Sequence, residues 1–551
     1  MNWLSQLAEH PFYEFALILV LAALLGALGQ LLRQPLIVMF IALGILVGPS
    51  VLDLVKSKDN IRLLAEIGIS ILLFIVGLKL DVRVIRSVGK IALLTGLGQV
   101  IFTSLVGYLI GLALGFSPLH SFYIAVALTF SSTIIIVKLL TDKKEIDSLH
   151  GQIAIGFLIV QDLVVILVMI VLSAMRMERA TTLGADLLKT LASGSILLLL
   201  TYVAMKWIIP RLSYFLARSQ EILTLSAIAW ALGLASLGEI MGFSGEVGAF
   251  LAGVSLASSS FKDVIGSRLV SLRDFLLLFF FVHLGANLNL GVIGNQVSAA
   301  LIFSVFVLVG NPLIVLIIMG VMGYRKRTSF LAGLTVAQIS EFSLIFAGLG
   351  LAIGHITEDT VGLITLVGII TIGLSTYLIL YSHRIYESLA PFLGLFERKH
   401  PYRENHASAS SGQQVDIILI GLGRFGSRIA DNLDNYPHLS YMAVDFDPTV
   451  VKEYEAKGRT IRYGDIEDPE LPEQIPFWDA RCIISTVPDK NISLHLLRIL
   501  KAQGYAGKII VTALNESDYG DLQPYAPDQI LLPYQIAADN FYTTQLAPLL
   551  G

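Results

Sequence analysis

Long apolar runs succeed one another from residue 12 to residue 382 of this 551-residue chain. Most are close to the length of about 20 residues at which a helix spans the hydrocarbon core of a bilayer. Only 15% of all residues are charged, whereas a soluble domain has about 25%. We therefore expect an all-α membrane domain over residues 1–392. Thirteen spans are predicted, near residues 12–31, 34–50, 62–80, 90–116, 119–141, 148–175, 185–209, 221–240, 243–259, 273–293, 297–323, 328–353 and 359–382.

The distribution of Lys and Arg among the loops predicts the topology. One set of alternate loops and helix ends is much richer in basic residues than the opposite set, and basic loops remain on the cytoplasmic side. With an odd number of spans, the N-terminus is expected outside and the part after the last span in the cytoplasm. The N-terminal residues lack the basic start of a cleaved signal. We expect a multi-pass protein of a bacterial inner membrane.

The composition becomes that of a soluble domain after residue 397. Residues 393–414 form a predicted linker that is rich in Ser, Gly and charge. The following V-D-I-I-L-I-G-L-G-R-F-G (415–426) predicts a strand, a glycine turn and the start of a helix. Further strands are predicted at Y-M-A-V-D (441–445), R-C-I-I-S-T-V (481–487) and K-I-I-V-T-A (508–513). Strands that alternate with helices indicate an α/β Rossmann-like domain, here over residues 415–551.

The glycine turn carries the G-x-G-x-x-G pattern at Gly421, Gly423 and Gly426, and Asp445 ends the next strand. In this context the turn lets a phosphate approach the backbone at a helix N-terminus. Asp445 would hold the ribose hydroxyls, and an acid there disfavours the 2′-phosphate of NADP. AMP, ADP, ATP and NAD(H) stay open, with AMP or NAD(H) favoured. The alternative is a domain that has lost its ligand and serves as a dimer scaffold.

Within the membrane part, L-I-V-Q-D-L-V-V-I-L (158–167) places Asp162 near the middle of a span. Charged side chains at that depth usually face a water-filled cavity. Two other spans are interrupted by polar residues, at F-S-S-T (130–133) and A-Q-I-S-E-F (337–342). Paired interruptions in the two halves of a chain indicate a transporter binding site, although the hydroxyls could instead bond back to their own helix. A single carboxylate that holds either a proton or a cation predicts cation/proton exchange.

The membrane part resembles the Kef-type potassium efflux antiporters, members of the second monovalent cation:proton antiporter family. This resemblance implies inverted repeats, with broken helices 5 and 12 crossing near mid-membrane. It also implies that Asp162 is the ion and proton carboxylate and Gln161 the cation-selecting neighbour. The matching stretches are I-A-L-G-I-L-V-G-P (41–49), A-E-I-G-I-S-I-L-L-F-I-V-G-L-K-L-D (65–81), S-S-T-I-I-I (131–136), V-Q-D-L-V-V-I (160–166), G-A-F-L-A-G-V-S-L-A (248–257), L-R-D-F-L-L-L-F-F-F-V-H-L-G (272–285) and A-Q-I-S-E-F (337–342). The candidate ion-binding residues are Asp162, Gln161, Ser131, Ser132, Thr133, Asn311, Gln338 and Glu341.

Three departures from the family pattern stand out. Where relatives often have a Lys in helix 11, this chain has Asn311 followed by Pro312. The loop 258–268 is not acidic, and residues 512–517 contain no arginine; both differ from glutathione-gated members.

The C-terminal part resembles the nucleotide-binding domain that regulates potassium conductance and transport. In that domain, the stretch matching Gly464 and Asp465 lies beside the adenine. The candidate nucleotide-binding residues are Gly421, Gly423, Arg424, Phe425, Gly426, Asp445, Asp465 and Thr486.

Together these patterns predict electroneutral K⁺/H⁺ exchange, in the direction of potassium efflux, regulated by an adenine nucleotide. We expect a homodimer in membrane lipid, with neither a nucleic-acid partner nor a catalytic cofactor. A Na⁺/H⁺ antiporter is the closest alternative. A nucleotide-gated K⁺ channel would need a T-V-G-Y-G-like filter, which the sequence lacks. A membrane oxidoreductase would need redox groups beyond the single cysteine, Cys482.

Overall fold

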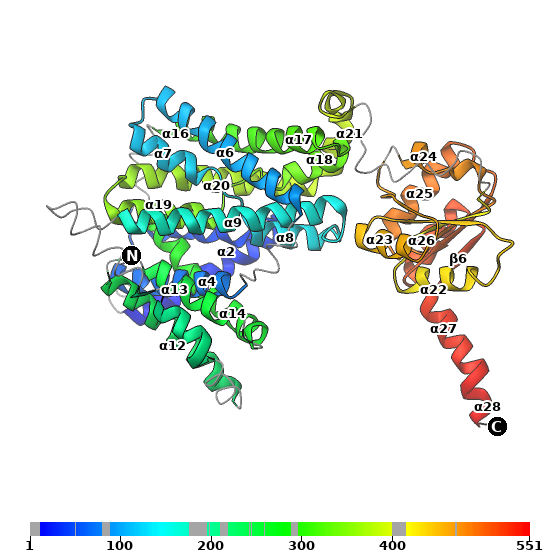
Figure 1. Cartoon of the computed structure of the whole chain (residues 1–551), viewed down its shortest axis with the longest axis horizontal. Coiled ribbons are helices and arrows are strands. Elements are labelled where there is room, and N and C mark those ends of the chain that lie inside the picture. The colour runs from blue at the N-terminus through cyan, green and yellow to red at the C-terminus, as the bar shows by residue number, and fades with distance from the viewer. Residues whose placement is uncertain are drawn as a thin grey trace. The chain divides into compact units, whose positions relative to one another are not determined.

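The computed structural model describes residues 11–550 except 50, 55, 80–88, 176–195, 198, 210–218, 242, 244, 258, 260, 288–295, 399–414 and 469–470. The chain forms two compact units, each with its own hydrophobic core (Figure 1). The first comprises Met1–Leu139, Ile153–Ile318 and Phe330–Ser382. The second comprises Leu140–Gln152, Met319–Ser329 and His383–Gly551. The predicted boundaries at residues 392 and 414 remain predictions.

The first unit is helical. Within the described residues, eight helices are long and apolar enough to cross a membrane: α2 (Pro11–Leu31), α4 (Lys58–Lys79), α6 (Lys90–Ala113), α9 (Leu149–Met175), α12 (Gln220–Ile240), α14 (Lys262–Ala286), the run α16 (Val297–Val305), π-helix η3 (Phe306–Gly310) and α17 (Asn311–Val321), and α20 (Glu358–Leu380). Shorter apolar helices are α3 (Leu36–Val47), α7 (Pro118–Ala127), α13 (Gly245–Leu256) and α19 (Glu341–Ile353). The number thirteen stays a prediction, because residues 185–195 and 198 of the expected span 185–209 lie outside the described residues. The described remainder of that span includes π-helix η1 (Ala204–Ile208).

Two of the shorter helices end at non-helical residues inside expected spans. Helix α7 ends at Ala127, and α8 (Thr133–Asp142) begins after five residues without helical structure. Likewise α18 (Lys326–Leu334) and α19 are separated by residues 335–340. Ser340 starts α19 by accepting a hydrogen bond from the backbone N–H of Phe342 at 3.2 Å, which satisfies one of the free donors at the helix start.

Four helices of the first unit touch through glycines. A Cβ at Gly44 on α3 would collide with the backbone oxygen of Val282 on α14, and one at Gly253 on α13 would collide with that of Phe74 on α4. Small residues at such places let helix backbones approach closely, as is common in membrane proteins. We call α3, α4, α13 and α14 the glycine-packed helices.

The second unit contains a parallel six-stranded sheet in the order β3-β2-β1-β4-β5-β6, the order of a Rossmann fold. Two of its strands, β3 and β6, are short and were not predicted. The strands are β1 (Ile417–Ile420), β2 (Tyr441–Asp445), β3 (Ile461–Tyr463), β4 (Cys482–Ser485), β5 (Lys508–Thr512) and β6 (Gln529–Leu531). The helical elements are α21 (Ser382–Leu393), η4 (Gly394–Phe396), α22 (Arg424–Leu433), α23 (Pro448–Ala456), α24 (Leu471–Gln474), η5 (Phe477–Asp479), α25 (Lys490–Ala502), α26 (Glu516–Leu522), η6 (Gln523–Tyr525), α27 (Pro533–Phe541), η7 (Tyr542–Leu546) and α28 (Ala547–Leu550).

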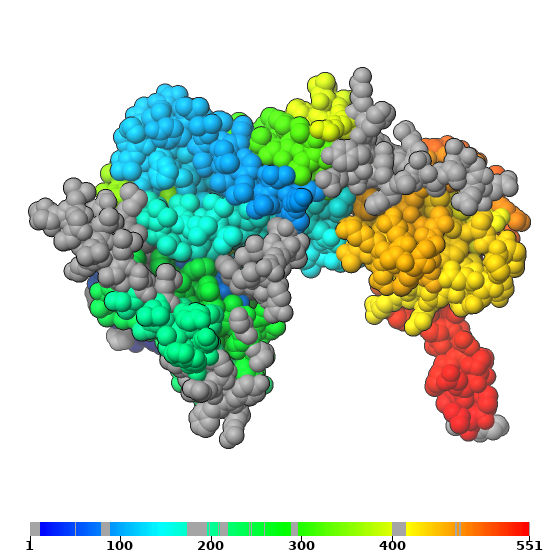
Figure 2. Space-filling model, viewed as in Figure 1, coloured from blue at the N-terminus to red at the C-terminus, as the bar shows by residue number. Residues whose placement is uncertain are grey.

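Both faces of this sheet are covered, because alternate strand residues point to opposite sides. Leu419 packs with Ala430 of α22 and Val451 of α23. Ile418, one residue earlier, packs with Leu496 and Leu497 of α25. Beyond β6, the segment α27–η7–α28 extends away from the sheet and is largely exposed (Figures 1 and 2, red).

Candidate functional site

The first candidate site surrounds the non-helical residues between α7 and α8. Thr133, the first residue of α8, donates a hydrogen bond from Oγ1 to Asp162 Oδ2 on α9 at 2.9 Å. Ser131 Oγ donates to the backbone oxygen of Val336 in the other non-helical segment at 3.5 Å. Ser132 Oγ accepts from the Ile135 N–H within its own segment at 3.4 Å. The non-helical residues of both segments therefore lie side by side, with the Asp162 carboxylate next to one of them.

Gln161 points in a different direction from Asp162, because adjacent helix residues are rotated by about 100°. Its Oε1 accepts from the backbone N–H of Ser131 at 3.1 Å, and its Nε2 donates to Gln99 Oε1 at 2.7 Å. Gln161 is fully buried, whereas Asp162 is only half-buried. Both ends of the Gln161 amide are thus engaged in holding the non-helical residues against α6.

Asn311 joins the two non-helical segments. Its Nδ2 donates to the backbone oxygens of Leu128 at 3.4 Å and Val336 at 3.3 Å. Its Oδ1 accepts from Thr103 Oγ1 at 2.7 Å. Asn311 follows the π-helix η3 and is fully buried. At this position the chain has an amide, which can donate to carbonyls and accept from a hydroxyl at once.

Gln99 and Thr103 on α6 complete a continuous polar chain that sequence reasoning missed. Gln99 Nε2 donates to Thr103 Oγ1 at 3.0 Å and to the backbone oxygen of Thr129 at 3.1 Å. The chain therefore runs from Gln161 through Gln99 and Thr103 to Asn311. The available signal was two polar residues four positions apart within an apolar span, on one helix face.

Gln338 and Glu341 are directed to other partners. Gln338 Oε1 accepts from Ser375 Oγ on α20 at 2.9 Å. Glu341 is 1% exposed, and its Oε2 accepts from Ser340 Oγ at 3.4 Å. Both lie at the second non-helical segment, but no described hydrogen bond joins either side chain to Asp162.

The second candidate site is the glycine turn between β1 and α22. Gly421 has a φ of 86°, the left-handed region that favours glycine, and Thr486 Oγ1 donates to its carbonyl at 2.7 Å. A Cβ at Gly426 would collide with the Gly421 oxygen, so the turn packs tightly there. At Gly423, the N-cap of α22, a Cβ would meet no described heavy atom within 4 Å. That open side is where a phosphate could reach the helix N-terminus.

Asp445 closes the other side of this turn. Its Oδ2 accepts from the Leu422 N–H at 2.6 Å and its Oδ1 from the Asp447 N–H at 2.9 Å. Burial raises the pKa of Asp445, although these backbone donors oppose the rise. Arg424 is exposed in the first turn of α22, and Phe425 is half-buried. Asp445 stays close enough to the glycine turn to meet a ribose bound there.

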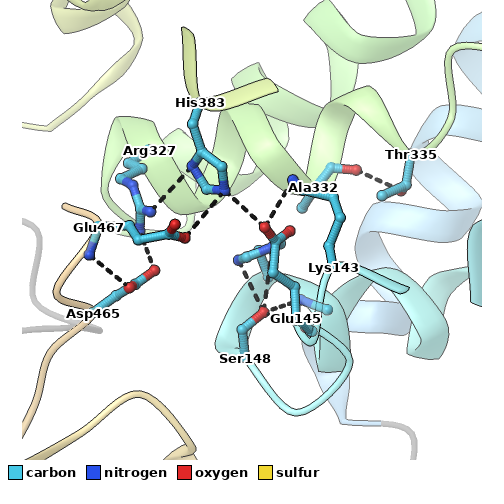
Figure 3. A network of polar contacts seen from close by, with 11 residues as sticks. Lys143, Glu145, Ser148, Arg327, Ala332, Thr335, His383, Asp465 and Glu467 are labelled. Atoms are coloured by element: carbon cyan, nitrogen blue, oxygen red, sulfur yellow. Dashed lines mark hydrogen bonds and ion pairs between the residues drawn. The ribbon is translucent and has the colours of Figure 1, made fainter. Parts of the chain in front are cut away.

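Asp465, which follows β3, belongs to a polar network drawn in Figure 3. Arg327 Nη1 lies 2.7 Å from Asp465 Oδ2, and the Glu467 N–H donates to Oδ1 at 3.0 Å. Burial alone would raise the pKa of Asp465, but the charge and hydrogen bond of Arg327 outweigh it and hold this pKa below its usual range. The structure therefore pairs a predicted nucleotide residue with an arginine from the segment Met319–Ser329.

His383 of α21 extends this network toward the segment Leu140–Gln152. His383 Nε2 lies 2.7 Å from Glu145 Oε1 and 3.4 Å from Glu467 Oε2 (Figure 3). These three donor atoms lie within 4.8 Å of one another, a spacing compatible with a metal ion. However, Lys143 Nζ already contacts Glu145 Oε1 at 2.7 Å, and Arg327 Nη2 faces His383 Nδ1 at 3.4 Å. The side chains of Lys143 and Arg327 thus already contact the atoms that would have to bind a metal ion.

Comparisons with known proteins match both the membrane part and the C-terminal part of the chain. The family described as "Sodium/hydrogen exchanger, transmembrane" matches residues 17–380, and the "TrkA-N domain" family matches residues 417–533. YbaL of Escherichia coli, named as a cation/proton antiporter, is 28% identical over 93% of each chain. The iron transporter MagA of Paramagnetospirillum magneticum is 30% identical over 69% of this chain and 88% of its own. KefB of Alkalimonas amylolytica, named as a K⁺ efflux antiporter, is 26% identical over 95% of this chain and 79% of its own.

Proposed function

The chain belongs to the sodium/hydrogen exchanger family, with a TrkA-N domain after the membrane part, and we propose that it exchanges K⁺ for H⁺. The resemblance to Kef-type antiporters is confirmed by the full-length likeness to YbaL and KefB. Family membership makes it a monovalent cation:proton antiporter in a membrane. The choice of K⁺, the direction of efflux and the roles of single residues are our proposals.

The observation that carries the mechanism is the contact between Asp162 and Thr133 beside the paired non-helical segments. We propose that these segments belong to broken helices that cross within inverted repeats. Carbonyls and hydroxyls of these segments replace part of the cation's water shell. Asp162 holds the cation when ionised and a proton on the return. With one such carboxylate and a neutral amide beside it, the exchange is one for one and electroneutral.

Exchange in proteoliposomes tests this function. Internal pH is followed after outward gradients of K⁺, Na⁺, Rb⁺ or Li⁺, and Fe²⁺ is included because MagA is named an iron transporter. The proposal expects proton movement with K⁺ that is independent of membrane voltage. A response to Na⁺ alone would establish the closest alternative, a Na⁺/H⁺ antiporter. A K⁺ current without proton movement would establish a channel instead.

Substitution of the carboxylate tests its role. Asp162→Asn keeps the size and hydrogen-bonding capacity of the side chain but cannot exchange a proton, so we expect exchange to disappear while the protein stays folded. Glu239→Gln is the matched control, because Glu239 is an exposed carboxylate at the end of α12. Persistent exchange in Asp162→Asn would remove Asp162 from its proposed role.

The TrkA-N domain is of the nucleotide-binding regulatory type, and we propose AMP or NAD(H) as its ligand. The open side of Gly423 and the nearby Asp445 support a phosphate and a ribose at this turn. We further propose that this domain is cytoplasmic, that the N-terminus is outside, and that the protein is a homodimer in an inner membrane. Binding of AMP and NADH to the purified full-length protein, followed by calorimetry, tests the ligand.

A further inference from the structure

The loops that follow β2, β3 and β4 form one edge of the sheet in the second unit. In parallel α/β sheets, ligands bind beyond the carboxyl ends of the strands, where the strand order reverses. That reversal lies between the neighbouring strands β1 and β4. Asp447, Asp465 and Asp489 each come shortly after one of these strands. We call these three loops the carboxyl edge.

Each loop of the carboxyl edge is contacted by another segment of the same unit. Lys144 Nζ lies 2.8 Å from Asp489 Oδ2, and Gln152 Nε2 donates to Asp447 Oδ1 at 3.1 Å. Both aspartates also cap helices: Asp447 accepts from the Thr449 N–H of α23, and Asp489 from the N–H groups at the start of α25. The segment Leu140–Gln152 is therefore docked onto the two helix starts that border the glycine turn.

Arg327, in the segment Met319–Ser329, makes a much more buried ion pair at the carboxyl edge than Lys144 does. The exposed fraction of the side chain is 7% for Arg327 and 18% for Asp465, but 74% for Lys144. Loss of one partner from a buried ion pair is strongly destabilising, because it leaves an uncompensated buried charge. Exposed ion pairs contribute little to stability. Glu467 of the same loop is joined through His383 to Glu145 in the docked segment.

The docked segment leads directly to the proposed ion site along the chain. Residues 143–148 connect α8, which begins with Thr133, to α9, which carries Asp162. A change in the position of this short connection must shift the ends of both helices, because neither backbone can stretch. The same connection therefore belongs to a nucleotide-site unit and to the two helices that share the Thr133–Asp162 hydrogen bond.

We propose that the carboxyl edge is the surface through which a bound nucleotide controls exchange. A nucleotide at the glycine turn and Arg327 would both act on Asp465, and the segment Leu140–Gln152 contacts the other two loops of the carboxyl edge. Nucleotide binding and the docking of these segments therefore affect each other. The segment Leu140–Gln152 then transmits this bias to α8 and α9. The inference rests on the proposed nucleotide-regulated exchange and names the route of that regulation. Binding linkage is reciprocal, so docking must alter nucleotide affinity by the same factor.

Hydrogen–deuterium exchange of the wild-type full-length protein provides the first test. With saturating AMP or NADH, we expect the exchange rate of amides in 140–152 and 325–329 to change together with that of the glycine turn. If calorimetry shows that the nucleotide binds while the amides of 140–152 exchange unchanged, the proposal is overturned. This measurement needs no substitution and is independent of any folding defect.

Arg327→Gln is the second test, with Lys457→Gln as the control at the exposed C-cap position that follows α23. In the wild type, a saturating nucleotide is expected to change the initial K⁺/H⁺ exchange rate by a measurable factor. In Arg327→Gln that factor should fall to about 1, while exchange without nucleotide continues. The control should keep the wild-type factor.

Other outcomes separate this inference from the proposed function. If Arg327→Gln retains the full nucleotide response, the route through Asp465 is wrong. If its nucleotide affinity falls by more than the coupling factor between docking and nucleotide binding, Arg327 belongs to the pocket and the coupling claim also fails. Should Arg327→Gln not fold, Lys144→Glu at an exposed position replaces it and is expected to weaken the response. If the wild type shows no cation/proton exchange at all, it is the proposed function that fails.

Discussion

Gln161 and Asp162 show how two adjacent residues can perform different tasks. The half-buried Asp162 meets the hydroxyl of Thr133, whereas the buried Gln161 ties the backbone of Ser131 to Gln99. The resemblance assigns Gln161 to cation selection. In the structure its amide can act on the cation indirectly, because it fixes the backbone of the segment that carries the hydroxyls. A neutral amide does this without adding a second proton-exchanging group.

Thr103 gives a residue-scale prediction, because it both accepts from Gln99 and donates to Asn311. Thr103→Val has nearly the same shape but leaves the Asn311 Oδ1 acceptor buried without this donor, at a cost of about 1–3 kcal/mol. We expect the maximum exchange rate to fall about tenfold, while Thr103→Ser retains it. Flux in proteoliposomes gives the rate.

A double-mutant cycle provides the control for Thr103. In an Asn311→Ala background, Thr103→Val should have little further effect, because the partner of its hydroxyl is already absent. Equal losses in both backgrounds would show that the hydroxyl does not act through Asn311. A wild-type rate in Thr103→Val would contradict the positioning role altogether.

At the scale of single residues, the sequence predicts which side chains belong to the candidate site better than it predicts their hydrogen-bond partners. The cost of a charge in the membrane singled out Asp162, and the interrupted spans singled out Ser131 and Thr133. Gln99 and Thr103 escaped attention because polar residues four positions apart on one helix can satisfy each other within that helix, as these two partly do. The pairing of Asn311 with carbonyls of both non-helical segments depends on residues 183 and 25 positions away. No periodicity in a single sequence encodes such distances.

The glycine turn, with its flanking strand and helix, is the part of the fold whose position the sequence predicted best. Its strand, its turn and its helix lie where the pattern placed them, since each depends on local residues. The strands β3 and β6 were missed because each has only three residues, too few to show alternation. The two non-helical segments lie at the predicted polar interruptions. They could be predicted because a run of Ser, Thr or Gln stands out within a long apolar span.

Two glycines of this turn give an element-scale prediction. Gly423→Ala adds a methyl group on the open side, so it should block phosphate approach and weaken nucleotide binding, with no change in the thermal unfolding midpoint. Gly426→Ala places its methyl group against the Gly421 carbonyl. It should weaken binding and also lower the midpoint. Calorimetry and thermal unfolding of the full-length variants measure these effects.

The contrast between these variants is the informative result. Unchanged nucleotide affinity in Gly423→Ala would mean that no phosphate approaches the α22 N-terminus. The remaining interpretation would then be a Rossmann-like scaffold without a ligand. A normal midpoint in Gly426→Ala would show that the turn can relax away from its carbonyl contact.

On the scale of the whole molecule, the units do not follow the linear order of the chain. The nucleotide-site unit includes two short segments, Leu140–Gln152 and Met319–Ser329, that lie between helices of the first unit in sequence. Composition predicted the membrane part and the soluble part correctly as classes. It could not assign these segments, because contacts such as that between His383 Nε2 and Glu145 Oε1 join residues 238 positions apart in the sequence.

The segment α27–η7–α28 supports a prediction about assembly. Phe541 is 51% exposed and Tyr542 is 58% exposed, and exposed groups of large apolar side chains often mark interaction sites. We expect the full-length protein in mild detergent to have the mass of a dimer by light scattering. The double variant Phe541→Ser/Tyr542→Ser should shift that mass toward the monomer.

Tyr436→Ser is the matched control, because Tyr436 is 53% exposed and lies outside this segment. It should leave the mass of the dimer unchanged. A dimer that survives the double substitution would place the contact elsewhere on the molecule.

The glycine-packed helices have a mechanical consequence. Where the backbones of α3 and α14, and those of α4 and α13, touch through glycine, no side chain remains between them to be compressed or to change rotamer. These helix pairs should therefore resist sliding past one another and should deform little when the lateral pressure of the lipid changes. The polar chain through α6, α9 and α17, in contrast, consists of hydrogen bonds that can exchange partners. A change in bilayer thickness should therefore alter the cation/proton exchange rate before it disturbs the packing of the glycine-packed helices.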